Sequence, residues 1–142
     1  MSPESNHADS MSAVLATLAR ANVDPTEEEL AAAPFLDKWE VVRDAFNYTI
    51  LYGRVIGHPT LRGTAIKTSP LLRLNAAAGW ARTFSRFYCL GEPLSAGRHP
   101  QQSDAVNNEF YEVLETDMED GIRRNRDLIL ASPQLFRRVG PA

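Results

Sequence analysis

The chain has 142 residues, a size that fits one domain with a single hydrophobic core. Its hydrophobic fraction of 44% and charged fraction of 23% are those of a globular protein and exclude a largely disordered one. No apolar run approaches the roughly 18 residues that span a bilayer, and the polar first residues lack the pattern of a signal peptide. Cys89 is the only cysteine, which excludes an internal disulfide and gives no zinc motif. We therefore expect a cytoplasmic protein without a metal or another cofactor.

The net charge of −3 conceals an uneven distribution of charge along the chain. Residues 1–53 hold nine acids and three bases, a net −6, whereas residues 54–98 hold seven bases and one acid, a net +6. Residues 99–142 hold eight acids and five bases, a net −3. A basic middle between acidic flanks indicates either an anionic partner or segments that neutralise each other within the fold.

The N-terminal part predicts a tail followed by two short helices. Residues 1–9 carry no apolar periodicity and are typical of a disordered tail. Apolar residues then recur at helical spacing from Met11 to Leu18. A second short helix starts at Thr26, which stands in capping-box spacing with Glu29.

The middle of the chain predicts three strands. Aromatic and β-branched residues alternate over 46–56 and predict the first one. Residues 64–74 predict the second, in which Pro70 indicates a bulge or an edge position. Residues 80–90 fit either a strand or an amphipathic helix, and the glycines on both sides favour the strand. Residues 39–43 add either a fourth strand or a connecting turn of helix.

The C-terminal region predicts one long helix. It starts at Ser103 or Asp104, and its apolar residues recur at helical spacing through Ile122. Asp120 and Arg124 stand four residues apart and predict a supporting ion pair on the helix surface.

These elements predict an α+β fold with a single domain over residues 10–138 and a short tail over 139–142. The domain is a small antiparallel sheet of three or four strands with two short N-terminal helices. The long C-terminal helix packs on one sheet face, since a lone three-stranded sheet needs such cover to be stable.

Three short motifs mark the central region: GHP at 57–59, TSPL at 68–71, and GWART with SR-Y-LG over 79–91. This pattern resembles a group of short uncharacterised bacterial proteins, mainly alphaproteobacterial, that share the same signature. The resemblance covers roughly residues 34–93 and leaves both flanks unmatched. That group has no assigned activity, so the resemblance implies an origin and no mechanism.

Catalytic chemistry has one candidate, His58, which lies in a glycine-flanked turn. Together with Ser69 or Thr68 it would give a small enzyme, although no motif such as G-x-S-x-G surrounds either hydroxyl. Isolated histidines beside a turn more often bond the backbone, so we first interpret His58 as structural. The three histidines lie far apart and the acids form no ligand spacing, which predicts no metal site. Cys89 is interpreted as a small buried hydrophobic residue.

A face that mixes arginine with aromatic residues is the most informative feature of the sequence. Read as one strand, residues 80–90 place these side chains together: Trp80, Arg82, Phe84, Arg86 and Tyr88. Rings can stack on bases while guanidinium groups contact phosphate, and the same residue types anchor protein interfaces. The alternative is that the rings form the core beneath the long helix, whose acids pair with the arginines. With the other bases, the predicted binding residues are Arg62, Lys67, Arg73, Trp80, Arg82, Phe84, Arg86 and Tyr88.

The sequence favours a non-enzymatic binding or regulatory module over an enzyme. We expect its basic region, residues 54–98, to recognise an anionic partner, either nucleic acid or an acidic protein surface, and we expect no membrane contact. The size and the lack of catalytic motifs are compatible with a phage or mobile-element inhibitor of a host complex. The alternatives are the small enzyme built around His58 and a structural homo-oligomer joined through an edge strand or the long helix.

Overall fold

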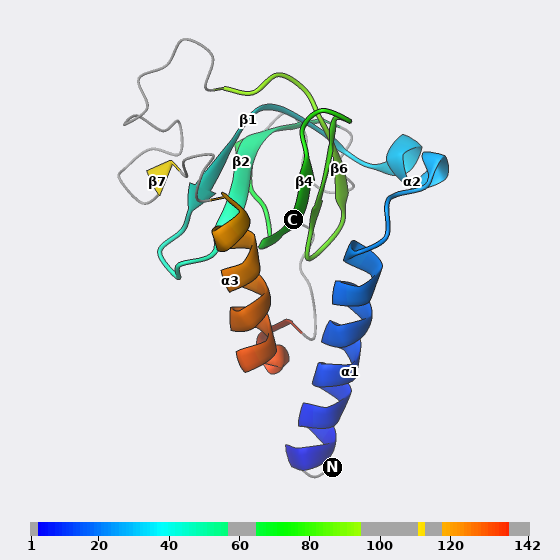
Figure 1. Cartoon of the computed structure of the whole chain (residues 1–142), viewed down its shortest axis with the longest axis vertical. Coiled ribbons are helices and arrows are strands. Elements are labelled where there is room, and N and C mark those ends of the chain that lie inside the picture. Colours follow the sequence, from blue (N-terminus) through cyan, green and yellow to red (C-terminus); the bar gives the residue numbers. More distant parts are fainter. Residues whose placement is uncertain (1–2, 57–64, 95–110, 113–117, 137–142) are drawn as a thin grey trace.

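A computed structural model describes residues 3–56, 65–94, 111–112 and 118–136 as an α+β protein in which two helices pack beside a curled sheet (Figure 1). The helices are α1 (Pro3–Ala21), α2 (Glu27–Ala32), α3 (Met118–Ala131) and the 3-10 helix η2 (Pro133–Phe136). The strands are β1 (Phe35–Arg43), β2 (Thr49–Ile56), β3 (Ala65–Lys67), β4 (Leu71–Asn75), β5 (Trp80–Thr83), β6 (Phe87–Leu90) and β7 (Tyr111–Glu112). None of the helices in these ranges is long and apolar enough to cross a membrane.

The sheet is mixed and holds more strands than the expected three or four. Six strands follow the order β3-β2-β1-β6-β5-β4, and β7 pairs with β1 beside this path. Neighbouring strands are antiparallel except β1 and β6, which run parallel with Phe35 opposite Cys89 and Leu36 opposite Leu90. Two antiparallel meanders, β1–β3 and β4–β6, therefore meet along one short parallel contact. The expectation of a purely antiparallel sheet is wrong at this contact.

The expected strand over 64–74 is in fact two strands at opposite edges of the sheet. Pairing of β3 with β2 ends at Thr68, whose Oγ1 accepts the backbone N–H of Leu51 at 3.0 Å. The hydroxyl takes the place of a backbone carbonyl, and Pro70 then offers no N–H for the ladder to continue. The chain leaves the first meander here and enters the second.

The expected strand over 80–90 is a hairpin. The chain reverses after β5, and the N–H of Thr83 donates to the carbonyl of Arg86 at 2.9 Å. The antiparallel pairing of β5 with β6 then places Ala81 opposite Tyr88. Both halves alternate as strands do, so the expectation of strand structure is correct for each half. The turn between them contains no glycine or proline, so nothing in the sequence indicated it.

The helices differ from the expectation mainly in their ends. α1 begins at Pro3, within the segment expected to be a tail, and proline suits the first helical position because its missing N–H costs nothing there. α2 has the predicted capping box of Thr26 and Glu29, with both reciprocal hydrogen bonds present. The predicted C-terminal helix is wrong at residues 111–112, which form β7, and α3 begins only at Met118. Residues 103–110 lie outside the described part of the chain.

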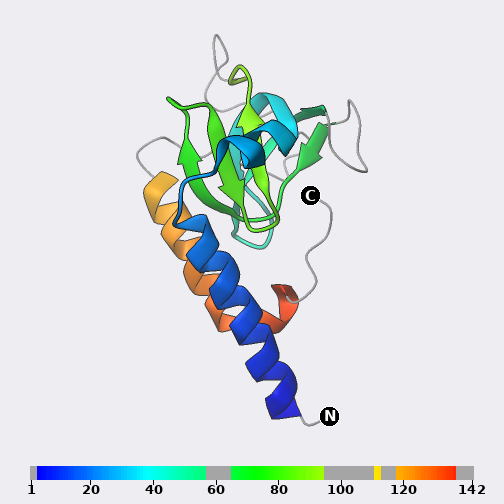
Figure 2. The same cartoon turned by 90° about the vertical axis from the view of Figure 1, so that its right-hand side faces the viewer.

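Hydrophobic residues are buried on both faces of the sheet. Leu71 and Leu72, neighbours on β4, point to opposite faces and belong to separate core clusters. The first cluster fills the concave side of the sheet, where Met118 and Ile122 of α3 pack against it. The second cluster lies between β4 and the helices α1 and α3, which run beside each other in Figure 2. The helical cover is therefore shared between α1 and α3.

Asn125 of α3 joins two strands that the sheet does not pair. Its side chain is fully buried, accepts the N–H of Thr49 at 2.9 Å and donates to the carbonyl of Thr49 at 2.7 Å. The same amide donates to the carbonyl of Leu71 at 2.8 Å, which links β2 to β4. Gly121, one turn earlier, lets the helix approach this closely, because a Cβ there would collide with the Thr49 hydroxyl. A single amide thus satisfies backbone groups on two strand edges.

Candidate anion-binding surface

The β4–β6 meander presents one face on which arginine and aromatic side chains adjoin. Cross-strand partners share a face, and the register places Arg82 opposite both Phe87 of β6 and Arg73 of β4. Trp80, two residues before Arg82, lies on the same face because side chains alternate along a strand. This face therefore carries two arginines between two large rings.

The face that the sequence predicted is not one surface. It was expected to hold five side chains: Trp80, Arg82, Phe84, Arg86 and Tyr88. Phe84 and Arg86 lie in the turn between β5 and β6, and Tyr88 lies opposite Ala81 and points into the concave core. The expectation is wrong because it carried a period of two through a reversal of the chain.

Four guanidinium groups gather at this face, and we call them the arginine cluster: Arg20, Arg73, Arg82 and Arg126. The guanidinium carbon of Arg73 lies 4.8 Å from the centre of the Trp80 ring. Those of Arg82 and Arg20 lie 4.9 Å and 5.3 Å from the centre of the Phe87 ring. The rings thus hold three of the four groups by cation–π contacts.

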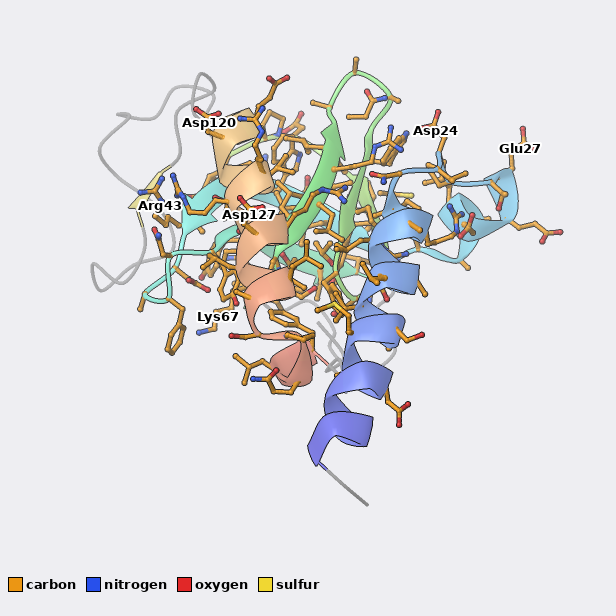
Figure 3. All side chains as sticks on the ribbon, turned by 60° about the horizontal axis from the view of Figure 1, so that its bottom comes forward. Asp24, Glu27, Arg43, Lys67, Asp120 and Asp127 are labelled. Carbon is orange, nitrogen blue, oxygen red and sulfur yellow. The ribbon has the colours of Figure 1, made fainter. Side chains whose placement is uncertain are left out.

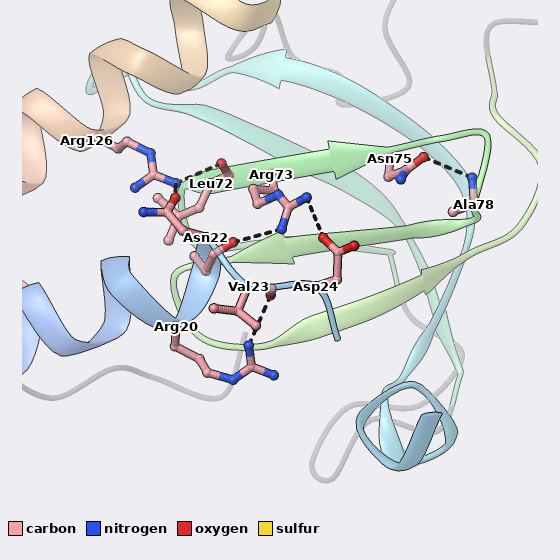
Figure 4. A network of polar contacts seen from close by, with 10 residues as sticks. Arg20, Asn22, Val23, Asp24, Leu72, Arg73, Asn75, Ala78 and Arg126 are labelled. Atoms are coloured by element: carbon pink, nitrogen blue, oxygen red, sulfur yellow. Dashed lines mark hydrogen bonds and ion pairs between the residues drawn. The ribbon is translucent and has the colours of Figure 1, made fainter. Parts of the chain in front are cut away.

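Two carboxylates from the segment between α1 and α2 pair with this cluster. Arg73 Nη2 lies 2.8 Å from Asp24 Oδ1, as Figure 4 shows. Arg20 pairs with Glu29, whose carboxylate also accepts the N–H of Thr26 at 2.9 Å in the capping box. These hydrogen bonds and the charge of Arg20 lower the pKa of Glu29, against the opposing effect of desolvation.

The other two arginines of the cluster bond only uncharged groups among the described residues. Arg82 donates to two backbone carbonyls of the turn after β5, at 2.8 Å and 3.2 Å. Arg126 donates to Asn22 Oδ1 at 3.0 Å. Burial and the charge of Arg20 lower the pKa of Arg82, and the charge of Glu29 opposes this shift. Burial and the charge of Arg73 lower the pKa of Arg126. Both groups nevertheless stay charged at neutral pH, so the cluster carries an excess of positive charge.

The aromatic residues predicted to bind a partner belong to the core. Trp80, Phe84 and Tyr88 expose 5%, 2% and 0% of their surface. Rings buried to this degree cannot stack on nucleotide bases, so the predicted stacking surface is absent at these three positions. As in the alternative interpretation, the rings belong to the core. Its other half is wrong among the described residues, because Arg73 pairs with Asp24 and Arg82 bonds backbone carbonyls, and neither pairs with an acid of the long helix.

The remaining predicted bases are dispersed. Lys67 is exposed on the edge strand β3, and Figure 3 places it on the other side of the molecule from Asp24. Arg86 is half-buried in the turn between β5 and β6, and its Nε has no hydrogen-bond partner among the residues that the structure describes. Arg62 lies outside the described residues. Of the three predicted arginines that are described, Arg73 and Arg82 are the two that meet.

The hydroxyl groups considered for catalysis take part in structural hydrogen bonds. Thr68 Oγ1 donates to the carbonyl of Ser69 at 2.9 Å, besides its bond to β2. Ser69 Oγ accepts the N–H of Ser85 and contacts its hydroxyl, both at 2.9 Å. His58 lies outside the described residues. In the part of the chain that the structure describes, no three metal-ligating side chains come together.

Sequence reasoning missed half of the arginine cluster and both of its acids. Arg20 lies on α1 and Arg126 on α3, and nothing in the local sequence connects them with residues 73–82. The sequence did show that residues 1–53 are acidic and residues 54–98 basic. The ion pair of Asp24 with Arg73 joins these two segments. The Asp24–Arg73 pair agrees with the interpretation in which segments of the chain neutralise each other. Two of the four guanidinium groups still pair with no described carboxylate.

Comparison with known proteins gives one match. A model of a family of unknown function, DUF6634, matches residues 4–111 of the 142. The match includes three members of the arginine cluster, and Arg126 lies beyond it. No curated protein and no solved structure matches the chain.

Proposed function

We propose that this chain, which belongs to DUF6634, a family of unknown function, is a non-enzymatic binding module that recognises an anionic partner through its arginine cluster. The observation that carries the proposal is the imbalance of charge: among the described side chains, four guanidinium groups meet two carboxylates. Half-buried arginines gain more from a charged acceptor than from a carbonyl, because hydrogen bonds between charged groups are roughly twice as strong.

The contacts around Arg82 and Arg126 support this role. Both side chains are held in place by neutral acceptors, so their guanidinium groups need little further ordering to bind an anion. Both also carry a pKa lowered by burial and by a neighbouring arginine, a state that an added negative charge relieves. A partner that supplies carboxylate or phosphate oxygens at this place would complete the ion pairing of the cluster.

The class of partner that the observations favour is an acidic protein surface. Arginine is enriched among the residues that dominate protein interfaces. Recognition of single-stranded nucleic acid depends on exposed rings, and Trp80, Phe84 and Tyr88 are buried. We further propose that the protein acts in the bacterial cytoplasm as a phage or mobile-element inhibitor of a host complex. The signature motifs around residues 57–91 are the basis for the bacterial origin.

The test is a binding titration of the full chain against three probes across a salt series: polyglutamate, duplex DNA and single-stranded RNA. We expect polyglutamate binding that weakens steeply with salt and falls by about tenfold or more in the Arg82→Gln/Arg126→Gln variant. The matched control is Arg123→Gln, since Arg123 lies exposed on α3 and already pairs with Asp120 at 2.9 Å. Circular dichroism and an unfolding curve establish that each variant is folded.

The outcomes separate the partner classes. Loss of polyglutamate binding in the double variant alone supports an acidic protein partner. Tight duplex binding with the same loss would instead assign the surface to nucleic acid. Absence of binding to all three probes at low salt, or an equal loss in Arg123→Gln, would overturn the proposal.

A further inference from the structure

Three buried polar atoms that have no hydrogen-bond partner in the described part of the chain lie on adjoining elements at the start of α3. They are Arg43 Nε, Thr49 Oγ1 and Arg124 Nη1. Thr49 is fully buried, and both arginines are half-buried. Buried donors without an acceptor are rare in folded proteins, because each has given up its hydrogen bond to water without a replacement.

The register of β1 and β2 places the first two side chains side by side. Arg43 is the cross-strand partner of Thr49, so both project from the same face of the sheet. Val41 and Leu51, two residues further along these strands, are also partners and belong to the concave core against which α3 packs. Because side chains alternate along a strand, Arg43 and Thr49 point to that same side, under α3.

The third side chain comes from the flank of α3 that faces this hairpin. Gly121 packs directly on the Thr49 hydroxyl, and Asn125 bonds the Thr49 backbone. Arg124 follows Gly121 by three residues, so the two are neighbours on the helix surface, whereas Arg126 on the opposite flank reaches towards β4. In Figure 3, Arg43 lies beside this end of α3.

No ion pair between described side chains includes either arginine of this group. The predicted pair of Asp120 with Arg124 does not form, because Asp120 pairs with Arg123 on the exposed side of α3. Glu119 and Asp127 are exposed, and no described ion pair includes them. The first turn of α3 adds the partial positive charge of its N–H groups at the same place.

We propose that Arg43, Thr49 and Arg124 form a binding site for a single tetrahedral oxyanion of the phosphate or phosphomonoester class. A phosphate group offers at least three acceptor oxygens, which matches two guanidinium donors and one hydroxyl donor, whereas a carboxylate offers two oxygens. Guanidinium groups bind phosphate oxygens through parallel N–H donors, and a dianion neutralises both arginines at once. The site shares no residue with the arginine cluster, so it goes beyond the proposed function.

The first experiment titrates the full chain with inorganic phosphate and, as a reference, with chloride at equal ionic strength. Binding is measured by calorimetry, and stability by the midpoint temperature of thermal unfolding. We expect saturable binding and a midpoint that rises with phosphate. O-phosphoserine as a second probe distinguishes a phosphomonoester ligand from free phosphate, and dimethyl phosphate is the negative probe because its two ester bonds remove acceptor oxygens and one charge.

Variants then locate the site. Arg43→Gln and Arg124→Gln should each weaken phosphate binding by about tenfold or more. Arg123→Gln, one residue away on the exposed side of α3, should leave it unchanged. Thr49→Val keeps the shape of the side chain, so it should leave the phosphate-free protein as stable as the parent while it weakens phosphate binding.

Two results would overturn the proposal. One is a midpoint that does not differ between phosphate and chloride in the parent protein. The other is an equal loss of binding in Arg123→Gln and Arg124→Gln, which would indicate general attraction to the positive surface of α3. Binding that disappears only in Arg43→Gln, Thr49→Val and Arg124→Gln supports the site.

Discussion

Tyr88 is a residue whose environment leads to a prediction about alkaline pH. It is fully buried in the concave core, its hydroxyl has no hydrogen-bond partner among the described residues, and burial raises its pKa to about 12. The unfolded chain has an ordinary tyrosine that ionises near pH 10. The folded state therefore keeps its proton over a range of pH in which the unfolded state loses it.

We predict that Tyr88 lowers the free energy of unfolding as pH rises through this range. Below pH 10 both states are protonated, so its contribution is constant. Above it, ionisation stabilises the unfolded state by roughly 2 kcal/mol at pH 12. The Tyr88→Phe variant should show a flatter decline between pH 9 and 12, measured by urea unfolding. Its stability at neutral pH should match or exceed that of the parent, because an unpartnered hydroxyl is removed. Parallel declines in the two proteins would contradict the prediction.

For single residues, the sequence indicated which residue types occur together better than it indicated how deeply each side chain is buried. Arginine does contact aromatic rings in this region, but the rings are Trp80 and Phe87, both are buried, and Phe87 was expected on the opposite face. Which rings are buried depends on the helices that cover them, and that information lies tens of residues away. Arg20 and Arg126 come from such distant segments and could not be assigned from local pattern.

Elements that are specified by local contacts were predicted well, and those that depend on distant contacts were not. The capping box of α2 involves two residues three apart, and the sequence identified it correctly. The end of β3 depends on a hydroxyl of Thr68 that bonds β2, seventeen residues away. The parallel contact of β1 with β6 joins residues more than fifty apart, and alternation along a strand says nothing about its neighbour.

Asn125 gives a prediction at the level of elements, because its amide connects α3 to β2 and β4. Asn125→Ala would leave one N–H and two carbonyl groups buried without partners and would open a small cavity. We expect the free energy of unfolding to fall by about 3–5 kcal/mol, measured by chemical denaturation. Arg123→Ala on the exposed side of the same helix should change it by no more than about 0.5 kcal/mol. Similar losses in both variants would show that the amide does not join the strands.

Over the whole molecule, the acidic N-terminal part lies against the basic middle. Arg73 with Asp24 joins the end of α1 to β4 and follows this opposition of charge. Lys38 with Glu92, at 2.8 Å, joins β1 to the end of β6 and runs against it, because here the base belongs to the first segment and the acid to the middle one. The sequence indicated the opposition and left open whether it was internal or meant for a partner, and the Asp24–Arg73 pair shows that part of it is internal.

Asp24 should therefore have opposite effects on stability and on binding. Asp24→Asn removes a carboxylate that lies 2.8 Å from Arg73 and is largely exposed, so we expect a loss of about 0.5–1 kcal/mol at low salt. The loss should shrink as salt rises, because screening weakens exposed pairs. The same change should strengthen binding of an anionic probe, since one internal competitor is gone. Asp127→Asn on the exposed side of α3 is the control, and equal behaviour of the two variants would contradict this account.

The bond from Asn125 to β2 and β4 also bears on how the chain emerges during synthesis. Both meanders are complete once residue 90 is made, yet the carbonyl groups of Thr49 and Leu71 wait for a side chain 35 residues later. At about 5–20 residues per second, the nascent protein spends a few seconds with two strand edges open to other chains. Premature termination before Asn125 would make that interval permanent. Truncated products of this chain should accordingly depend on chaperones more than the full-length protein does.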